Sequence, residues 1–305
     1  MGIDFASRVD RAEQAIWADA RVLEQRRFGH HFRTPDPAGV RAALAGYATA
    51  DGGYGFALEP DGRGPVSQPL HVEFALVVLD EVGALDAGTA GRVGDYLASV
   101  SHPDGGLPAV HRSIRDYPRA PWWVVDDGDT GSLIPTARIV SLLRRNGINH
   151  PWLATASDFC WRRIETLAGG EAATHPYEVD SAVAFLDAAD DRERATRPAE
   201  RLGELVRREG MVLVDPDHPE LATPSPGYAP GEWHLPHDYA PRPDSLARPW
   251  FSDAEFERGL DFLAAEQDAA GGWPVRWANW SAGAFREWRG PATVRALLTL
   301  REFGH

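Results

Sequence analysis

The chain carries four diglycine pairs, and their spacing restricts the fold more than any other feature of the sequence. Successive pairs lie 53, 64 and 102 residues apart, and the last gap is about two repeat lengths. Each pair follows one amphipathic helical pattern and precedes another. A chain of 305 residues therefore divides into about six helical hairpins of about 50 residues. The four pairs are Gly52-Gly53, Gly105-Gly106, Gly169-Gly170 and Gly271-Gly272.

A helical hairpin cannot bury its apolar face alone, so hairpins of this kind must stack to form a core. About six hairpins that close on themselves leave no exposed end. We therefore predict an all-α fold, an α/α toroid, formed by a single domain over residues 1–305.

Helical periodicity dominates the chain, and no segment alternates as a strand of useful length would. Pro291 suits the first turn of a helix, where its missing N–H group is harmless. The segment at about 211–249 is rich in Pro, His and Asp, and we expect a long loop excursion that buries Trp233 and Tyr239. The predicted helices cover residues 7–27, 37–48, 67–83, 88–101, 132–145, 151–168, 177–189, 192–209, 253–267 and 291–303.

Charge and cysteine content exclude several classes of protein. The formal net charge of −14 argues against nucleic acid as a partner, because phosphate binding needs clustered cations. The single cysteine, Cys160, forms neither an internal disulfide nor a thiolate-rich zinc site. No apolar run approaches the roughly 20 residues that span a bilayer, and no signal-peptide pattern is visible. We expect a cytoplasmic protein with no integral membrane segment, no bound metal and no cofactor.

The segment from Arg258 to Trp273 carries the sharpest motif in the chain. It contains a basic–glycine pair, an aromatic–leucine pair, Gln267, a short spacer and then a diglycine before Trp273. This order resembles the QW repeat of squalene-hopene and oxidosqualene cyclases. A glutamine amide is suited to meet the free carbonyls at a helix C-terminus, and a tryptophan is suited to stack over the turn. Degenerate copies end at Leu107 and at Tyr54.

On these motifs the chain resembles single-domain, bacterial-type members of the terpenoid cyclase and protein prenyltransferase superfamily of α/α toroids. In that family the repeats stabilise the ring and take no part in chemistry. The resemblance implies an isomerase, an enzyme that starts the cyclisation of a small hydrophobic isoprenoid with an acid in the central cavity. The cyclases in question place this cavity between two helical domains. A lone ring would then need a homodimer, another partner or the segment at 211–249 as a lid.

The resemblance also implies where a site would lie, because the inner helices of such rings begin at one mouth of the cavity. Carboxylates and aromatic residues occur at each predicted junction. They are equally the residue types of ordinary helix capping and dipole compensation, so the pattern leaves both interpretations open. The junctions contain Glu59, Asp61, His71 and Glu73; Asp127 and Asp129; Tyr177, Glu178 and Asp180; and Glu287, Trp288 and Arg289.

The stretch Asp127-Gly128-Asp129-Thr130 resembles the Asp-x-Asp-Asp motif of class II terpene cyclases. The resemblance implies that Asp127 and Asp129 are the catalytic acid pair. In such a pair, a like-charged and partly desolvated neighbour keeps one carboxyl protonated near neutral pH. Glu59, Asp61 and Glu287 are further candidates for the acid.

Aromatic residues near the predicted mouth are candidates for substrate binding. Trp123, Trp280 and Trp288 offer ring faces that stabilise carbocations or stack on sugars, and these residue types therefore fit two enzyme classes. His71 and Tyr177 complete the predicted aromatic lining.

Glu287 and Arg289 flank Trp288 just before Gly290-Pro291, where we predict that the last helix begins. In an extended approach segment, residues i and i+2 point the same way, so both side chains would face the cavity. Arg289 would orient a carboxylate or bind a diphosphate.

Two other functions fit the same residues. A carbohydrate-active toroid, either a hydrolase or a lyase, would use Glu59 and Asp61 facing Glu287 as acid and base. A non-catalytic toroid that only binds a ligand would also keep the ring, since a fold does not determine a function.

Overall fold

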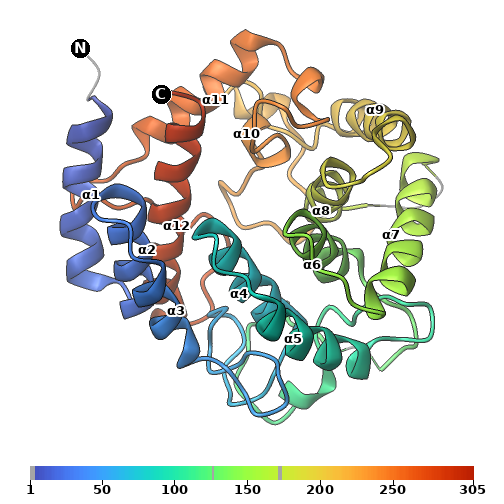
Figure 1. Ribbon diagram of the computed structural model, residues 1–305. Coiled ribbons are helices and arrows are strands. Elements are labelled where there is room, and N and C mark those ends of the chain that lie inside the picture. The colour runs from blue at the N-terminus through green and yellow to red at the C-terminus, as the bar shows by residue number, and fades with distance from the viewer. Residues whose placement is uncertain (1–3, 126, 171–173) are drawn as a thin grey trace. The chain divides into compact units, whose positions relative to one another are not determined.

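The computed structural model describes residues 4–125, 127–170 and 174–305. In these residues the chain forms twelve α-helices and three short 3-10 helices, and its only β pairing consists of isolated bridges (Figure 1). The α-helices are α1 (Phe5–Asp19), α2 (Val22–Phe32), α3 (Pro37–Ala45), α4 (Pro69–Glu81), α5 (Ala87–Val100), α6 (Leu133–Arg145), α7 (Trp152–Ala168), α8 (Pro176–Asp187), α9 (Arg192–Arg208), α10 (Pro236–Tyr239), α11 (Asp253–Ala265) and α12 (Ala282–Glu302).

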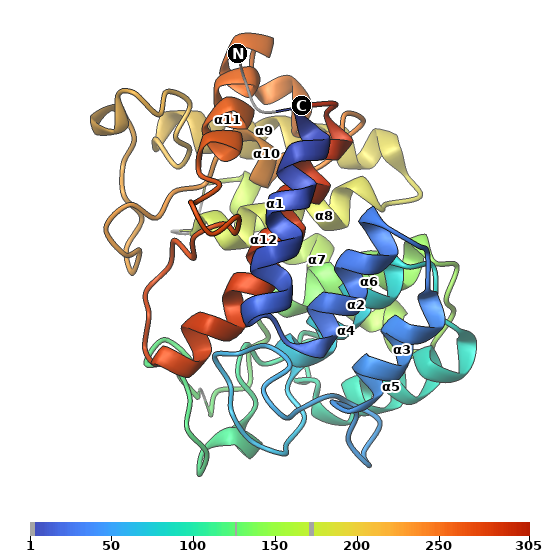
Figure 2. The ribbon, with the colours of Figure 1, turned by 90° about the vertical axis from the view of Figure 1, so that its left-hand side faces the viewer.

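The chain divides into two compact units. The first unit contains Met1–Asp36 together with Ala199–His305, and the second contains Pro37–Pro198. In the second unit α6 packs against α4, α7 and α8, while α5 packs against α7. In the first unit α1 packs against α2 and α12, and α12 also contacts α2 and α11. The first and last helices of the chain therefore lie side by side (Figure 2), as a closed succession of hairpins requires.

The predicted helices at the two ends of the chain differ most from the structure. The helix predicted over 7–27 is two helices, because Ala20 and Arg21 adopt extended backbone between α1 and α2. The side-chain amide of Gln25 donates to the carbonyl of Ala20 at 3.0 Å, and Arg21 forms an ion pair with Glu24 at 2.8 Å. These local contacts stabilise the break, although the apolar pattern continues across it.

The last helix begins nine residues earlier than predicted, and this corrects the interpretation of Glu287 and Arg289. The hydroxyl of Ser281 accepts from the N–H of Ala284 at 3.1 Å and caps α12, so Pro291 lies inside the helix instead of in its first turn. Positions i and i+2 of a helix point to different faces. Glu287 and Arg289 therefore do not project together, and the predicted extended segment is wrong.

Three of the four diglycine pairs form the same turn. The first glycine of each pair has a left-handed φ, which is 92° at Gly52, 93° at Gly105 and 94° at Gly271. A Cβ on these residues would meet the backbone carbonyl oxygen of an adjacent helix at 2.6, 2.5 and 2.0 Å, respectively. Only glycine accepts both the conformation and the close approach at low energy. These turns hold successive hairpins together.

An aspartate stabilises each of these three turns. Oδ1 of Asp51, Asp104 and Asp268 accepts the N–H of the second glycine of the pair at 3.1, 2.9 and 3.1 Å. The diglycine pairs were evident in the sequence, but the role of the aspartates was not. Their signal is an Asp directly before the first two pairs and three residues before the last.

The motif between Arg258 and Trp273 links the two ends of the chain. The side-chain amide of Gln267 donates to the carbonyls of Arg8 at 2.8 Å and Gly271 at 2.9 Å. The indole N–H of Trp273 donates to the carbonyl of Leu263 at 2.7 Å, in the last turn of α11. The tryptophan therefore pairs with the carbonyl in the last turn of α11, whereas the glutamine pairs with α1 and with the diglycine turn.

The excursion predicted at 211–249 contains α10 and a 3-10 helix at Pro219–Leu221, and a third short helix follows at Arg248–Trp250. Tyr239 is fully buried, and its hydroxyl donates to the carbonyl of Met211 at 2.8 Å. Trp233 packs against Leu213 and Leu235. The segment is thus folded onto its own small apolar cluster.

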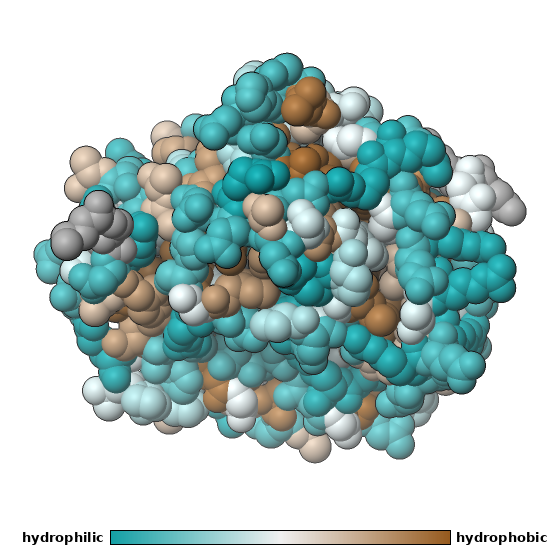
Figure 3. All heavy atoms as spheres, turned by 90° about the horizontal axis from the view of Figure 1, so that it is seen from above, coloured by the Kyte–Doolittle hydropathy of each residue, from teal (hydrophilic) through white to brown (hydrophobic). Residues whose placement is uncertain are grey.

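Polar side chains cover most of the face drawn in Figure 3, with apolar side chains scattered between them. Among the described helices, none is both long enough and apolar enough to cross a bilayer.

Candidate active site

A loop in the second unit, residues 55–64, presents two acidic side chains beside a second loop. The N–H of Arg63 donates to the carbonyl of Pro118 at 2.9 Å, and the N–H of Ala120 donates to the carbonyl of Asp61 at 2.8 Å. Just before the acidic residues, Phe56 and Ala57 have φ values of 55° and 59°. Left-handed backbone without glycine is strained by roughly 1–2 kcal/mol per residue, and such strain persists where the surroundings fix the geometry.

Glu59 and Asp61 are the acidic side chains of this loop. Oε2 of Glu59 accepts the N–H of Asp61 at 2.8 Å. Asp61 is almost fully buried, and its Oδ2 accepts the indole N–H of Trp122 at 3.0 Å. Burial raises the pKa of Glu59 well above its usual value, and the neighbouring charges of Asp61 and Glu73 add to this effect. Glu59 is therefore a carboxyl that stays protonated above the usual range.

His71 and Trp123 pack together next to these carboxyls. Their ring centroids lie 5.6 Å apart, and both side chains are buried. The Trp123 ring also covers Gly62, where a Cβ would lie 2.2 Å from the ring. The structure thus brings together Glu59, Asp61, His71 and Trp123, four of the residues that the sequence singled out.

A second group of charged side chains lies near the N-termini of α4, α6 and α8. It consists of Glu73, Arg138 and Asp180. Nη2 of Arg138 on α6 lies 2.8 Å from Oδ2 of Asp180 on α8, and its Nε lies 3.7 Å from Oε1 of Glu73 on α4. Each residue occupies the second turn of its helix, close to the N-terminus. The sequence placed Glu73 and Asp180 at helix junctions, but it gave no sign that Arg138 joins them.

Glu73 has the properties of a neutral acid. Burial raises the pKa of Glu73 to about 8, although the charge of Arg138 acts in the opposite direction and that of Asp180 adds to the rise. Its Oε2 is buried and forms no hydrogen bond with any described part of the chain. The rest of the side chain keeps 16% of its surface exposed. At neutral pH most molecules therefore carry a proton on this carboxyl.

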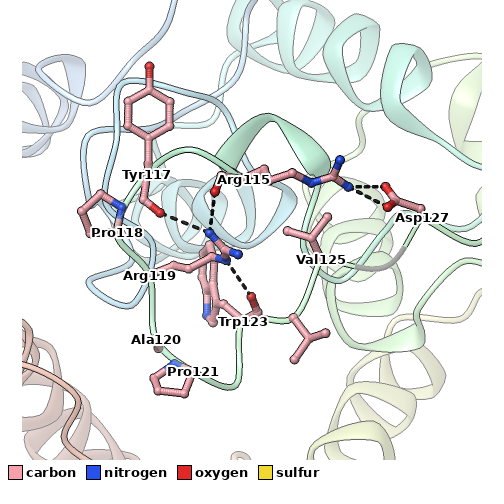
Figure 4. Close-up of a pocket in the computed structure, with 10 residues that line it drawn as sticks. Arg115, Tyr117, Pro118, Arg119, Ala120, Pro121, Trp123, Val125 and Asp127 are labelled. Atoms are coloured by element: carbon pink, nitrogen blue, oxygen red, sulfur yellow. Dashed lines mark hydrogen bonds and ion pairs between the residues drawn. The ribbon is translucent and has the colours of Figure 1, made fainter.

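Asp127 occupies a different environment from these buried acids. It lies at the edge of an open surface hollow (Figure 4). The hollow has a volume of about 710 Å³. Both carboxylate oxygens of Asp127 accept from the Arg115 guanidinium, at 2.5 and 2.6 Å. Its side chain is 68% exposed, and Asp129 is exposed as well. The acid pair that the motif predicts would instead be partly desolvated. The environment expected for the acid pair is therefore absent at these two residues.

Trp123 also lines this hollow, whose loop is held by Arg119 (Figure 4). The Arg119 guanidinium donates to the backbone carbonyls of Arg115 at 2.8 Å and Trp123 at 3.1 Å. This arginine stabilises the loop that carries Trp122 and Trp123 toward the carboxyls.

The other predicted binding residues have partners of their own within each unit. Tyr177 is stacked on His175 at the exposed start of α8, with ring centroids 5.4 Å apart. In the first unit, Trp288 packs edge-on against Trp277 at 4.9 Å, and Arg289 forms an ion pair with Asp268 at 2.6 Å.

Trp280 and Glu287 belong to the first unit as well, and both are partly exposed there. Within the described ranges, no group of three or more His, Cys, Asp or Glu side chains is arranged to hold a metal ion.

No family model matches the sequence, and no curated protein matches it. The chain is nevertheless similar to solved structures of the type II terpene cyclase MstE from Scytonema. A variant of that enzyme in complex with geranylgeranyl dihydroxybenzoate, its substrate, gives a TM-score of 0.54 at 13% identity, over 95% of this chain and 87% of that chain. The apo enzyme gives 0.54 at 13% identity, over 95% and 88% of the two chains. An apo variant gives 0.55 at 12% identity, over 95% and 86%.

These similarities show the fold. The chain has an all-α, terpenoid-cyclase-like α/α toroid fold, as the sequence predicted. Identities of 12–13% show nothing further about the reaction.

Proposed function

We propose that this protein is a terpenoid-cyclase-like enzyme that protonates a carbon–carbon double bond of an isoprenoid, and that Glu73 is the proton donor. The observation that carries the proposal is a buried carboxyl whose pKa is about 8 and whose Oε2 has no hydrogen-bond partner in the described structure. A double bond is a very weak base, so its donor must be a neutral acid in a poorly hydrated place.

The fold supports this proposal. The solved type II terpene cyclase is matched over 86–88% of its length, so an enzyme of that description is little longer than this chain. This similarity in length supports an activity that needs one ring of hairpins and no second helical domain.

The residues around Glu73 would serve the later steps. The proton forms a new C–H bond, the resulting carbocation is attacked by a second double bond, and loss of another proton ends the reaction. Trp123 packs on His71 and over Gly62 beside the acidic loop, and it is the aromatic side chain that we assign to stabilising the cation. The carboxylate left on Glu73 must be protonated again before the next turnover, and Glu59 is an acid close enough for their charges to interact.

The test is conversion of an isoprenoid by the purified protein. We would supply geranylgeranyl dihydroxybenzoate, the substrate of the similar enzyme, and isoprenoids of C10 to C30. A cyclised product has the mass of its substrate but a different retention time, and in D₂O it gains one deuterium. We expect Glu73→Gln to lower the rate by roughly 10²–10⁴, the range that general acids contribute.

Asp127→Asn is the matched control, because it also removes one carboxylate but from an exposed ion pair. We expect it to keep the wild-type rate. If Asp127→Asn or Asp129→Asn abolishes turnover while Glu73→Gln does not, the acid belongs to the loop at 127–129. If no isoprenoid is bound or converted, the proposal fails, and cleavage of a glycoside would favour the carbohydrate-active alternative.

A further inference from the structure

The Arg138 guanidinium lies between two carboxyl groups and is much closer to one of them. Its Nη2 is 2.8 Å from Oδ2 of Asp180, whereas its Nε is 3.7 Å from Oε1 of Glu73. The first distance is that of a charge-assisted hydrogen bond, and the second is a looser ion contact. The Arg138 guanidinium therefore pairs mainly with Asp180 and interacts more weakly with Glu73.

Burial strengthens this arrangement. Only 4% of the Asp180 side chain and 16% of the Glu73 side chain are exposed, compared with 30% of Arg138. Charges in such places are screened less by water than surface charges are. The charged groups that act on Glu73 are Arg138 from α6 and Asp180 from α8, and Glu59 of the loop at 55–64 also interacts with it.

We propose that Asp180 is a positioning residue for the proton donor: by holding the Arg138 guanidinium, it prevents that cation from pairing with Glu73 and so keeps Glu73 neutral. This inference rests on the proposed role of Glu73 as the acid. The ion pair between Arg138 on α6 and Asp180 on α8 would then determine whether Glu73 on α4 is protonated.

The two halves of the ion pair should then act in opposite directions. Asp180→Asn removes a negative charge near Glu73 and releases Arg138 to pair with it, so Glu73 should ionise at lower pH. Arg138→Gln removes the cation that lowers the pKa of Glu73, so Glu73 should stay protonated to higher pH. A purely structural ion pair would not give opposite shifts from its two partners.

The experiment is the pH dependence of turnover, measured for both variants with the isoprenoid that the wild type converts. Activity should fall at alkaline pH as Glu73 ionises. We expect Asp180→Asn to lower the midpoint of this fall by about one pH unit or more, and one unit corresponds to a tenfold change in the ionised-to-neutral ratio. Arg138→Gln should raise the midpoint, and Asp180→Glu should stay near the wild type.

Glu178→Gln is the matched control on α8. It removes one carboxylate two residues from Asp180, but that carboxylate pairs with Arg163 at 3.2 Å. Its midpoint should not move. If Asp180→Asn does not fold, Asp180→Ser takes its place and should lower the midpoint in the same way. Unchanged or parallel midpoints in Asp180→Asn and Arg138→Gln would overturn the inference.

A second measurement separates this inference from the proposed function. The carboxyl carbon of Glu73 can be titrated by ¹³C NMR without substrate, and its signal is assigned by its loss in Glu73→Gln. If the NMR titration shifts in opposite directions but no isoprenoid is converted, the ion pair controls Glu73 and the proposed reaction is wrong. If turnover depends on Glu73 but its titration is the same in all variants, the role of Asp180 is wrong.

Discussion

Two sets of carboxyl groups in this protein have pKa values that are shifted in opposite directions. One set, Asp51 and Asp268, stabilises diglycine turns, and the other, Glu59 and Glu73, belongs to the candidate active site. In the diglycine turns, burial alone would raise the pKa of Asp51, but hydrogen bonds from Ser67, Thr49 and Gly53 outweigh it and lower the pKa. The pKa of Asp268 is lowered in the same way, chiefly by the hydrogen bond and charge of Arg289.

In the acidic group formed by Glu59 of the loop at 55–64 and Glu73 of α4, burial dominates instead. Glu59 and Glu73 face other carboxyls and too few donors, so the pKa of each is raised. The same functional group thus stabilises a turn as an anion in one place and is held as a neutral acid in the other. What differs is the number of donors that reach it. We expect changes in the turns to lower stability and changes in the acidic group to lower activity.

The largest effect should come from Gly271→Ala. The substitution adds a Cβ where the Arg11 carbonyl oxygen would lie 2.0 Å away, at a φ of 94°. Left-handed strain and overpacking together should lower the free energy of unfolding by about 3 kcal/mol or more. Chemical denaturation measures this difference. Gly170→Ala is the control, since Gly170 has a φ of 73° but open space around it, and should lose only about 1 kcal/mol. Equal losses would show that close packing does not matter in the turn.

A smaller effect of opposite sign is expected for Glu73→Gln. The pKa of Glu73 is about 8 in the folded protein and near 4.5 in the unfolded chain, so the unfolded chain releases a proton first as pH rises. The folded protein therefore loses stability between about pH 4.5 and 8 through this group. Glu73→Gln should remove that loss, raising the melting temperature by several degrees at pH 8 and leaving it nearly unchanged at pH 4. A lower melting temperature at pH 8 would mean that Glu73 is ionised and paired.

The smallest effect should come from Asp51→Asn. Because the folded pKa of Asp51 is lowered, its carboxylate contributes stability above the unfolded value of 3.8, and this contribution is lost as pH falls through the folded value. The variant should be less stable than the wild type by about 1–2 kcal/mol at pH 7, since charge-assisted hydrogen bonds are replaced by neutral ones. The difference should shrink below about pH 4. A difference that persists unchanged at pH 3 would place its origin in geometry and not in charge.

The repeat predicted the fold because it is a property of short segments. Diglycine pairs at Gly52, Gly105 and Gly271 each terminate a helical pattern, and the structure gives all three the same φ to within a few degrees. The helices over 132–145 and 192–209 were placed to within one residue at each end, since their amphipathic patterns and end signals are local. The break between α1 and α2 was missed because an uninterrupted apolar pattern spans it.

The sequence by itself determined an all-α chain of repeated hairpins, the glycines that its turns require and the acidic loop at Glu59 and Asp61. Only the tertiary structure decided which acids are neutral. Glu73, Arg138 and Asp180 lie on three separate helices, and their distances arise from how α4, α6 and α8 pack. A pKa depends on desolvation and on charges within a few ångströms, which periodicity along a chain does not record. For the same reason Asp127, the acid favoured by its motif, is an exposed ion-paired carboxylate in the folded protein.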